Sequence, residues 1–79
     1  PDLAVEVVSS ETAADLEHKI RSYLRHGSRA VWVAYPDERV VYVYDGQSGC
    51  RILDEGKTLE APDLFPGFAL PVARVFAGL

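Results

Sequence analysis

The sequence contains one cysteine, Cys50, so no disulfide can form within the chain. Together with the lack of a recognisable signal peptide, this favours a reducing, cytoplasmic compartment. Long apolar runs are missing too: the longest uncharged one, residues 30–35, is far shorter than the about 20 residues of a membrane helix, so we expect no membrane partner. The chain starts at Pro1, directly before a strand, which we take as an indication that an upstream part has been removed.

Basic residues are few: the chain has 8 Lys and Arg and 12 Asp and Glu, which gives a formal net charge of -4. This balance argues against a general nucleic-acid-binding protein. The 79 residues are 48% hydrophobic and 25% charged, which is typical of a globular protein. We therefore predict a single domain, residues 1–79, that buries only about 60% of its unfolded surface and is marginally stable.

Several familiar catalytic and ligand-binding motifs are also absent. "GKT" at residues 56–58 is no phosphate-binding loop, because Gly49 precedes its glycine by seven residues instead of five and no helix follows. His18 and His26 lack the further ligands of a zinc site. No serine lies in a Gly-x-Ser-x-Gly turn, and Cys50 has no evident histidine partner, so nucleophilic catalysis has no support.

Hydrophobic patterning predicts four strands and two helices. The strands are expected at residues 3–8, 30–35, 40–44 and 50–53, with turns at 36–39 and 45–49. A long helix should begin at Thr12, where Asp15 completes a capping-box pattern, and end near His26 before Gly27. Its apolar stripe is Ala13, Leu16, Ile20, Tyr23 and Leu24.

The C-terminal part is interrupted by prolines, and we expect its apolar side chains to cover one face of the sheet. These side chains are Leu64, Phe65, Phe68 and Leu70. A short last helix should follow, with Pro71 at its N1 position.

The strand, helix and strand within the first 35 residues form a βαβ unit, so the first two strands should be parallel with a right-handed crossover. Residues 30–35 are apolar without alternation, which is typical of a central strand covered on both faces. The two later strands should extend the sheet as antiparallel hairpins. The expected fold class is therefore α/β with a mixed sheet.

One residue contradicts the apolar character of the first strand: Glu6. By alternation it shares a face with Ala4 and Val8, and a buried carboxylate costs several kcal/mol unless it is paired, protonated or bound to a metal. Lys19 lies at the edge of the apolar helical stripe, where its long side chain can reach along the sheet. The pair can be purely structural, and an edge-strand acid that faces solvent is the other simple interpretation.

A metal ion at Glu6 needs a second ligand from elsewhere. Asp2 is on the same face, but four strand residues separate the two carboxylates by about 13 Å. Mg²⁺ holds its oxygen ligands at about 2.1 Å, so one ion cannot bind both unless the strand bends. The partner has to come from a neighbouring strand, and residues 30–35 contain no acid.

The segments "PDLAVEVVSSETAADLEHKIRSYLRHGSRAVWVAYPDERVVYVY" and "FPGFALPVARVF" resemble the C-terminal half of the Uma family of bacterial restriction endonucleases, a branch of the PD-(D/E)XK nuclease superfamily. The resemblance covers nearly the whole chain. Its motifs are a "PDLxxEVxS" strand, a Lys-containing helix that ends in "YL..G", and an apolar strand that runs into a Pro-Asp turn. It implies a restriction-endonuclease-like fold with a truncated core, and hydrolysis of DNA phosphodiesters with Mg²⁺ or Mn²⁺.

The resemblance also implies site residues. Glu6 would be a metal ligand, the Val7 carbonyl a further one, and Asp2 matches the family's "PD". Val8 stands where the superfamily often has a lysine, so Lys19 would supply that charge from the helix. Relatives are roughly twice as long, and their metal-binding Asp usually comes from a preceding strand that this sequence does not contain.

Two functions follow as alternatives. The first is a DNA endonuclease, of which this chain carries an incomplete site that we expect to be inactive or nearly so alone. The second is a non-catalytic interaction or oligomerisation module with the nuclease fold, favoured by the acidic balance and the missing Asp. An open first strand, "LAVEVV" at residues 3–8, further predicts a homodimer or higher assembly.

Overall fold

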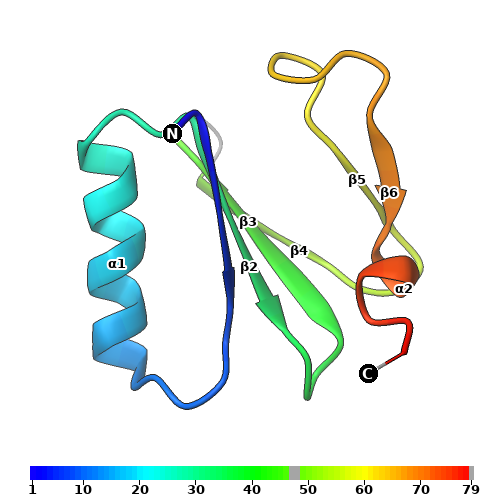
Figure 1. The fold of residues 1–79 in the computed structure, drawn as a ribbon, viewed down its shortest axis with the longest axis horizontal. Coiled ribbons are helices and arrows are strands. Elements are labelled where there is room, and N and C mark those ends of the chain that lie inside the picture. The colour runs from blue at the N-terminus through cyan, green and yellow to red at the C-terminus, as the bar shows by residue number, and fades with distance from the viewer. Residues whose placement is uncertain (47–48, 79) are drawn as a thin grey trace.

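The computed structural model describes residues 1–46 and 49–78. Its elements, in chain order, are β1 (Leu3–Val7), α1 (Ala13–Arg25), β2 (Ala30–Tyr35), β3 (Val40–Asp45), β4 (Gly49–Leu53), β5 (Thr58–Glu60), β6 (Ala69–Pro71) and α2 (Val72–Val75). They form three layers, with the main sheet in the middle, α1 on one side of it and β5, β6 and α2 on the other (Figure 1).

The main sheet confirms the predicted fold class. Within the described residues its strand order is β1-β2-β3-β4. β1 and β2 are parallel, with Leu3 opposite Ala30 and Val7 opposite Ala34, whereas β3 and β4 are added as antiparallel hairpins. β2 is internal, as its unbroken apolar run predicted, and β1 and β4 form the two edges. The centre of the 45–49 turn, residues 47–48, lies outside the described residues.

α1 begins and ends where its flanking residues predicted. The Thr12 hydroxyl accepts a hydrogen bond from the Asp15 N–H at 3.1 Å, which satisfies one of the free donors in the first helical turn. His26 is the C-terminal cap, and Gly27 follows with φ of 100°, a left-handed conformation that side chains with a Cβ rarely adopt. The helix buries Leu16 and Ile20 against the sheet.

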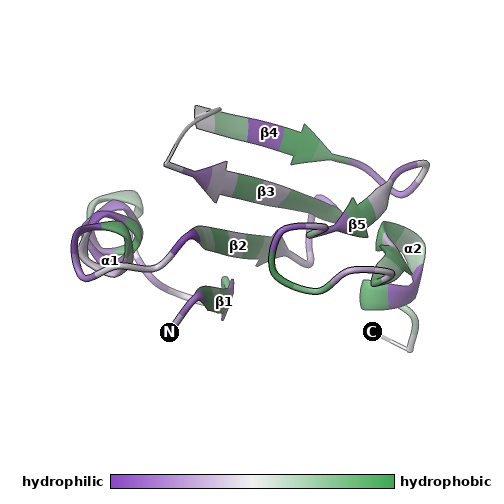
Figure 2. Ribbon diagram, turned by 90° about the horizontal axis from the view of Figure 1, so that it is seen from above, coloured by the Kyte–Doolittle hydropathy of each residue, from purple (hydrophilic) through white to green (hydrophobic). Residues whose placement is uncertain are grey.

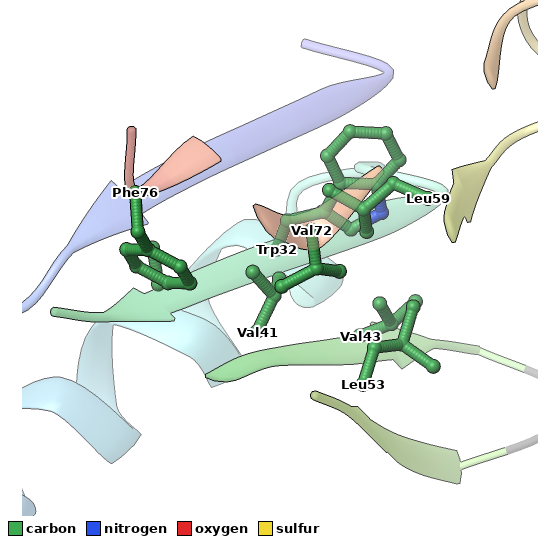
Figure 3. Close-up of a cluster of buried hydrophobic side chains, with 8 residues drawn as sticks. Trp32, Val41, Val43, Leu53, Leu59, Val72 and Phe76 are labelled. Carbon is green, nitrogen blue, oxygen red and sulfur yellow. The ribbon is translucent and has the colours of Figure 1, made fainter. Parts of the chain in front are cut away.

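Each face of the sheet has its own apolar core. On the side of α1, called the helix face here, the buried residues are Ala4, Leu16, Ile20, Val31 and Val33. On the opposite side, called the hairpin face, they are Trp32, Ala34, Val41, Val43, Leu53, Leu59, Val72 and Phe76 (Figure 3). Alternate residues of β2 enter the two cores, which explains why this strand is apolar throughout.

β5 and β6 were not predicted. They pair antiparallel, with Leu59 opposite Leu70, and Leu59 is buried in the core of the hairpin face. The C-terminal part does cover the sheet, but mainly through side chains other than the predicted ones: Leu59, Val72 and Phe76 are buried in this core. Of the four expected residues, Leu70 packs against the core, whereas Phe65 and Phe68 are 46% and 38% exposed. Pro71 was expected at the first helical position, but its ψ of 133° is extended, so it ends β6 and caps α2, whose first residue is Val72.

Thr12→Ala should lower the free energy of unfolding by about 1 kcal/mol, because the Asp15 N–H loses its acceptor in the first turn of α1. The measurement is urea unfolding followed by circular dichroism. Ser10→Ala is the control, because Ser10 is exposed in the same loop. Equal urea midpoints for Thr12→Ala and Ser10→Ala would contradict this role of Thr12.

Candidate active site

Glu6 and Lys19 form an ion pair on the helix face. The Lys19 Nζ lies 3.3 Å from the Glu6 Oε1. The Lys19 side chain is 48% exposed and the Glu6 side chain 20% exposed. Glu6 therefore does not point into bulk solvent, and the lysine singled out from the helical wheel is its partner. The pair is still open enough for a ligand to reach both groups.

The two side chains meet because of two different periodicities. Alternation along β1 turns Ala4 and Glu6 toward α1, while Val5 and Val7 point to the opposite face. On α1, Leu16 and Ile20 are buried in the helix-face core, and Lys19 lies beside them at the edge of this stripe, where it reaches Glu6 of β1. The crossover of the βαβ unit thus places the ammonium above the strand that carries the carboxylate.

The surroundings favour the charged form of Lys19. The hydrogen bond with Glu6 and the charge of Glu6 raise the pKa of Lys19 above 10.5, and Glu11 and Tyr23 contribute smaller effects in the same direction. Desolvation acts against this shift. Lys19 is therefore an ammonium ion at neutral pH, and it can donate hydrogen bonds to an anion but cannot accept a proton.

Helical spacing already placed Lys19 at the edge of the stripe that contains Tyr23, four residues further along α1. Sequence reasoning missed Glu11 as a neighbour of Lys19. Glu11 lies in the loop before α1, where its carboxylate accepts a hydrogen bond from the Ser9 hydroxyl at 3.3 Å. Loop conformation has no periodicity in the sequence, so this residue could not have been found that way.

The Val7 carbonyl faces the free edge of the sheet. The Val8 N–H donates to the Ala34 oxygen of β2 at 2.9 Å. In a trans peptide the C=O and N–H groups point in opposite directions, so the Val7 oxygen points away from β2. Among the described residues β1 is an edge strand, so in this part of the protein the oxygen is open to a ligand beside Glu6.

Asp2 is not brought to Glu6. Its side chain is exposed, and its backbone oxygen accepts from the Arg29 and Ala30 N–H groups at 2.8 and 3.2 Å, which fixes it at the start of β1. Glu6 is four residues further along this strand, about 13 Å away. Two oxygens, from Glu6 and Val7, suit Mg²⁺ in kind, but they are only part of its octahedral shell.

In residues 1–46 and 49–78, no group of three His, Cys, Asp or Glu side chains lies close enough to hold a metal ion. Of the metal ligands expected from the resemblance, the Glu6 carboxylate and the Val7 carbonyl are neighbours in β1, whereas Asp2 lies apart from them.

The "GKT" segment and the two histidines have simple structural places. Gly56 donates its N–H to the Asp54 carboxylate at 2.9 Å, and Lys57 lies 4.0 Å from the same side chain, in the turn that leads into β5 at Thr58. His18 and His26 are exposed on α1. Neither helix of the described residues has the length and apolar character that spanning a bilayer requires.

Comparison with known proteins agrees with this architecture. The crystal structure of a protein from Anabaena variabilis, described as "a putative nuclease belonging to DUF820", superimposes with a TM-score of 0.86 at 25% sequence identity. The match covers 98% of this chain but only 44% of that protein, so the chain spans less than half of its relative's length. No curated protein matches the chain.

A comparison with models of protein families identifies the family of this chain. The model of the Uma2 family, described as "Putative restriction endonuclease", matches residues 1–73 of the 79. The resemblance noted in the sequence is thereby confirmed, and the chain belongs to the Uma2 family.

Proposed function

We propose that this chain is part of a DNA endonuclease that hydrolyses phosphodiester bonds with Mg²⁺ or Mn²⁺ by the PD-(D/E)XK mechanism. The observation that carries the proposal is the Glu6–Lys19 ion pair, with 3.3 Å between Nζ and Oε1, at the free edge of a sheet. The family description, "Putative restriction endonuclease", supports DNA as the substrate.

In this proposal each group has a separate role. Glu6 and the Val7 carbonyl are the ligands that this chain provides for the divalent ion. A bound Mg²⁺ or Mn²⁺ lowers the pKa of water and offsets negative charge on phosphorus. Lys19 donates hydrogen bonds to a phosphate oxygen or to the attacking water, and its raised pKa keeps it cationic while charge develops.

The remaining ligands have to come from outside the described residues or from a second chain. Asp2 matches the "PD" of the family, but the about 13 Å along β1 argues against a shared ion with Glu6. We therefore expect the 79-residue chain to have little or no activity alone, in line with its coverage of 44% of the Anabaena protein.

A specific observation favours a second candidate function. The described residues contain no group of three metal-binding side chains, and the net charge is -4. A protein that keeps the nuclease fold as an interaction module, without catalysis, would have these properties. The two functions differ in whether Glu6 is needed for DNA cleavage.

Glu6→Gln and Lys19→Ala should each lower the rate of plasmid nicking by at least about 100-fold, because each removes a charge that acts on the reacting phosphate. The assay uses supercoiled plasmid, Mg²⁺ or Mn²⁺, and the longest natural protein that contains this sequence. Glu17→Gln is the control, because Glu17 is exposed and pairs with Arg21 at 2.7 Å. Equal nicking by wild type and Glu6→Gln would defeat the catalytic assignment and favour the interaction module.

The ion pair also predicts a pH dependence. Because folding raises the pKa of Lys19, the pair stabilises the folded state fully below pH 10.5, and this contribution is lost as the pH rises through the higher folded-state pKa. An NMR titration of the Lys19 ammonium should show a lower pKa in Glu6→Gln than in wild type. Glu17→Gln should leave it unchanged, and an unaltered Lys19 pKa in Glu6→Gln would contradict the pairing in solution.

A further inference from the structure

We propose that residues 54–78, called the C-terminal cover here, open from the hairpin face as one unit while α1 and the main sheet stay folded, and that Arg39 holds this cover closed. The state of the cover decides whether the apolar side chains of the hairpin face meet protein or water. The proposal rests on contacts within the described residues, and it is independent of the proposed function.

The cover is joined to the main sheet through side chains. Its strands β5 and β6 form a separate two-stranded sheet, so within the described residues neither of them pairs with β1–β4. The Val72 N–H donates to the Lys57 oxygen at 2.9 Å, and this bond lies inside the cover. Figure 2 shows β5 and α2 on the side of the main sheet opposite α1. The cover can therefore leave the sheet while the hydrogen bonds between the main strands stay intact.

The elements of the cover are too short to be stable by themselves. β5 and β6 have three residues each and α2 has four, whereas α1 has 13. The cover depends on docking, and Leu59, Val72 and Phe76 are its side chains that are buried in the core of the hairpin face. A segment with few buried apolar side chains opens at a lower free energy than the centre of a domain.

Arg39 has an unusual backbone conformation. It lies in the turn between β2 and β3, and its φ of 56° is the one positive value among the described residues other than glycine. A residue with a Cβ costs free energy in this left-handed conformation, where glycine or asparagine is typical. The Arg39 N–H donates to the Tyr35 oxygen at 2.8 Å within the same turn. The contacts of the Arg39 side chain offset the remaining cost.

The Arg39 guanidinium contacts two separate parts of the cover. Its Nε donates to the Glu55 Oε1 at 2.9 Å, in the connection between β4 and β5. Its Nη2 donates to the Phe76 oxygen at 3.4 Å, and its Cζ lies over the Phe76 ring, 5.7 Å from the ring centre. One side chain of the β2–β3 turn thus binds both the start of the cover and the end of α2.

The contact with Phe76 suits an arginine in particular. Phe76 is the C-terminal cap of α2, where backbone oxygens have no acceptor role within the helix and need an outside donor. Its ring is 1% exposed and fixed in the core, so the cation rests on a ring of defined orientation. A planar guanidinium can donate from two nitrogens and still lie over a ring, whereas the compact ammonium of a lysine cannot.

Opening of the cover would expose a continuous apolar surface. The side chains of the main sheet in this core are Trp32, Ala34, Val41, Val43 and Leu53. Trp32 is 7% exposed and lies beside Leu59 of the cover, at the end of the core opposite Phe76 (Figure 3). Exposure of such a surface to water is unfavourable, so the open form is a minor state whose population is set by the contacts of Arg39.

Hydrogen exchange of the 79-residue chain, measured for single amides by NMR, tests the separate opening. The protection factor of the Val72 amide should be at least about tenfold lower than those of the β2 amides, because the cover opens while the sheet stays closed. Equal protection factors for Val72 and the β2 amides would show that the cover opens only when the whole chain unfolds, and would overturn the proposal.

Arg39→Asn tests the role of Arg39, because asparagine tolerates a positive φ and the change removes the guanidinium without adding strain. The protection factor of Val72 should fall about tenfold further, while those of the β2 amides stay the same. Arg21→Gln is the matched control, since it removes a guanidinium that pairs with Glu17 at 2.7 Å on α1. Circular dichroism confirms that each variant is folded. An unchanged Val72 amide, or an equal fall in β2, would contradict this role.

Glu55→Gln tests the link between Arg39 and the start of the cover. Alone it should lower the protection factor of Val72, and added to Arg39→Asn it should cause no further fall, because the contact is already lost. Glu17→Gln should leave the Val72 amide unchanged. Effects of Arg39→Asn and Glu55→Gln that multiply in the double variant would show that the two residues act separately, and would refute the pair as the contact that holds the cover.

Discussion

The ion pair between Glu6 and Lys19 is the interaction on which the rest of this structure depends. A carboxylate in the middle of an apolar strand loses hydration when the helix covers it, and this cost has to be offset by a nearby cation. The crossover from β1 through α1 to β2 supplies that cation in a defined position. The fold thus tolerates a residue that weakens the strand, and it gains two opposite charges held 3.3 Å apart at the surface.

The strand that carries Glu6, β1, also forms an edge of the sheet in the described residues. β1 carries Glu6 on the helix face, and its Val5 and Val7 side chains and backbone groups are open on the other sides. A sheet edge of this kind accepts another strand, and an added strand lies next to the candidate active site. Any strand that lies at this edge of the described sheet, from the same chain or another, therefore contributes side chains beside Glu6.

Features with a regular period were predictable from the sequence. Alternation and helical spacing gave the main sheet, the start of α1 at Thr12 and the meeting of Glu6 with Lys19. Short and irregular features could not be predicted. β5 and β6 have three residues each, too few for alternation to be visible, so the burial of Leu59 of β5 in a core was not foreseen. Pro71 fits both a helix start and a strand end, and only pairing of β6 with β5 decided between them. The metal-binding role of Glu6 is a proposal, because alternation and helical spacing place a side chain but do not assign its chemistry.

A double-mutant cycle on DNA cleavage tests the central claim most directly. Nicking rates would be compared for wild type, Glu6→Gln, Lys19→Met and the double variant, in the longest natural protein that contains this sequence. If the two groups act on the same phosphate as one unit, the double variant should lose little more activity than either single variant. Losses that multiply in the double variant, or no loss in any variant, would contradict the account.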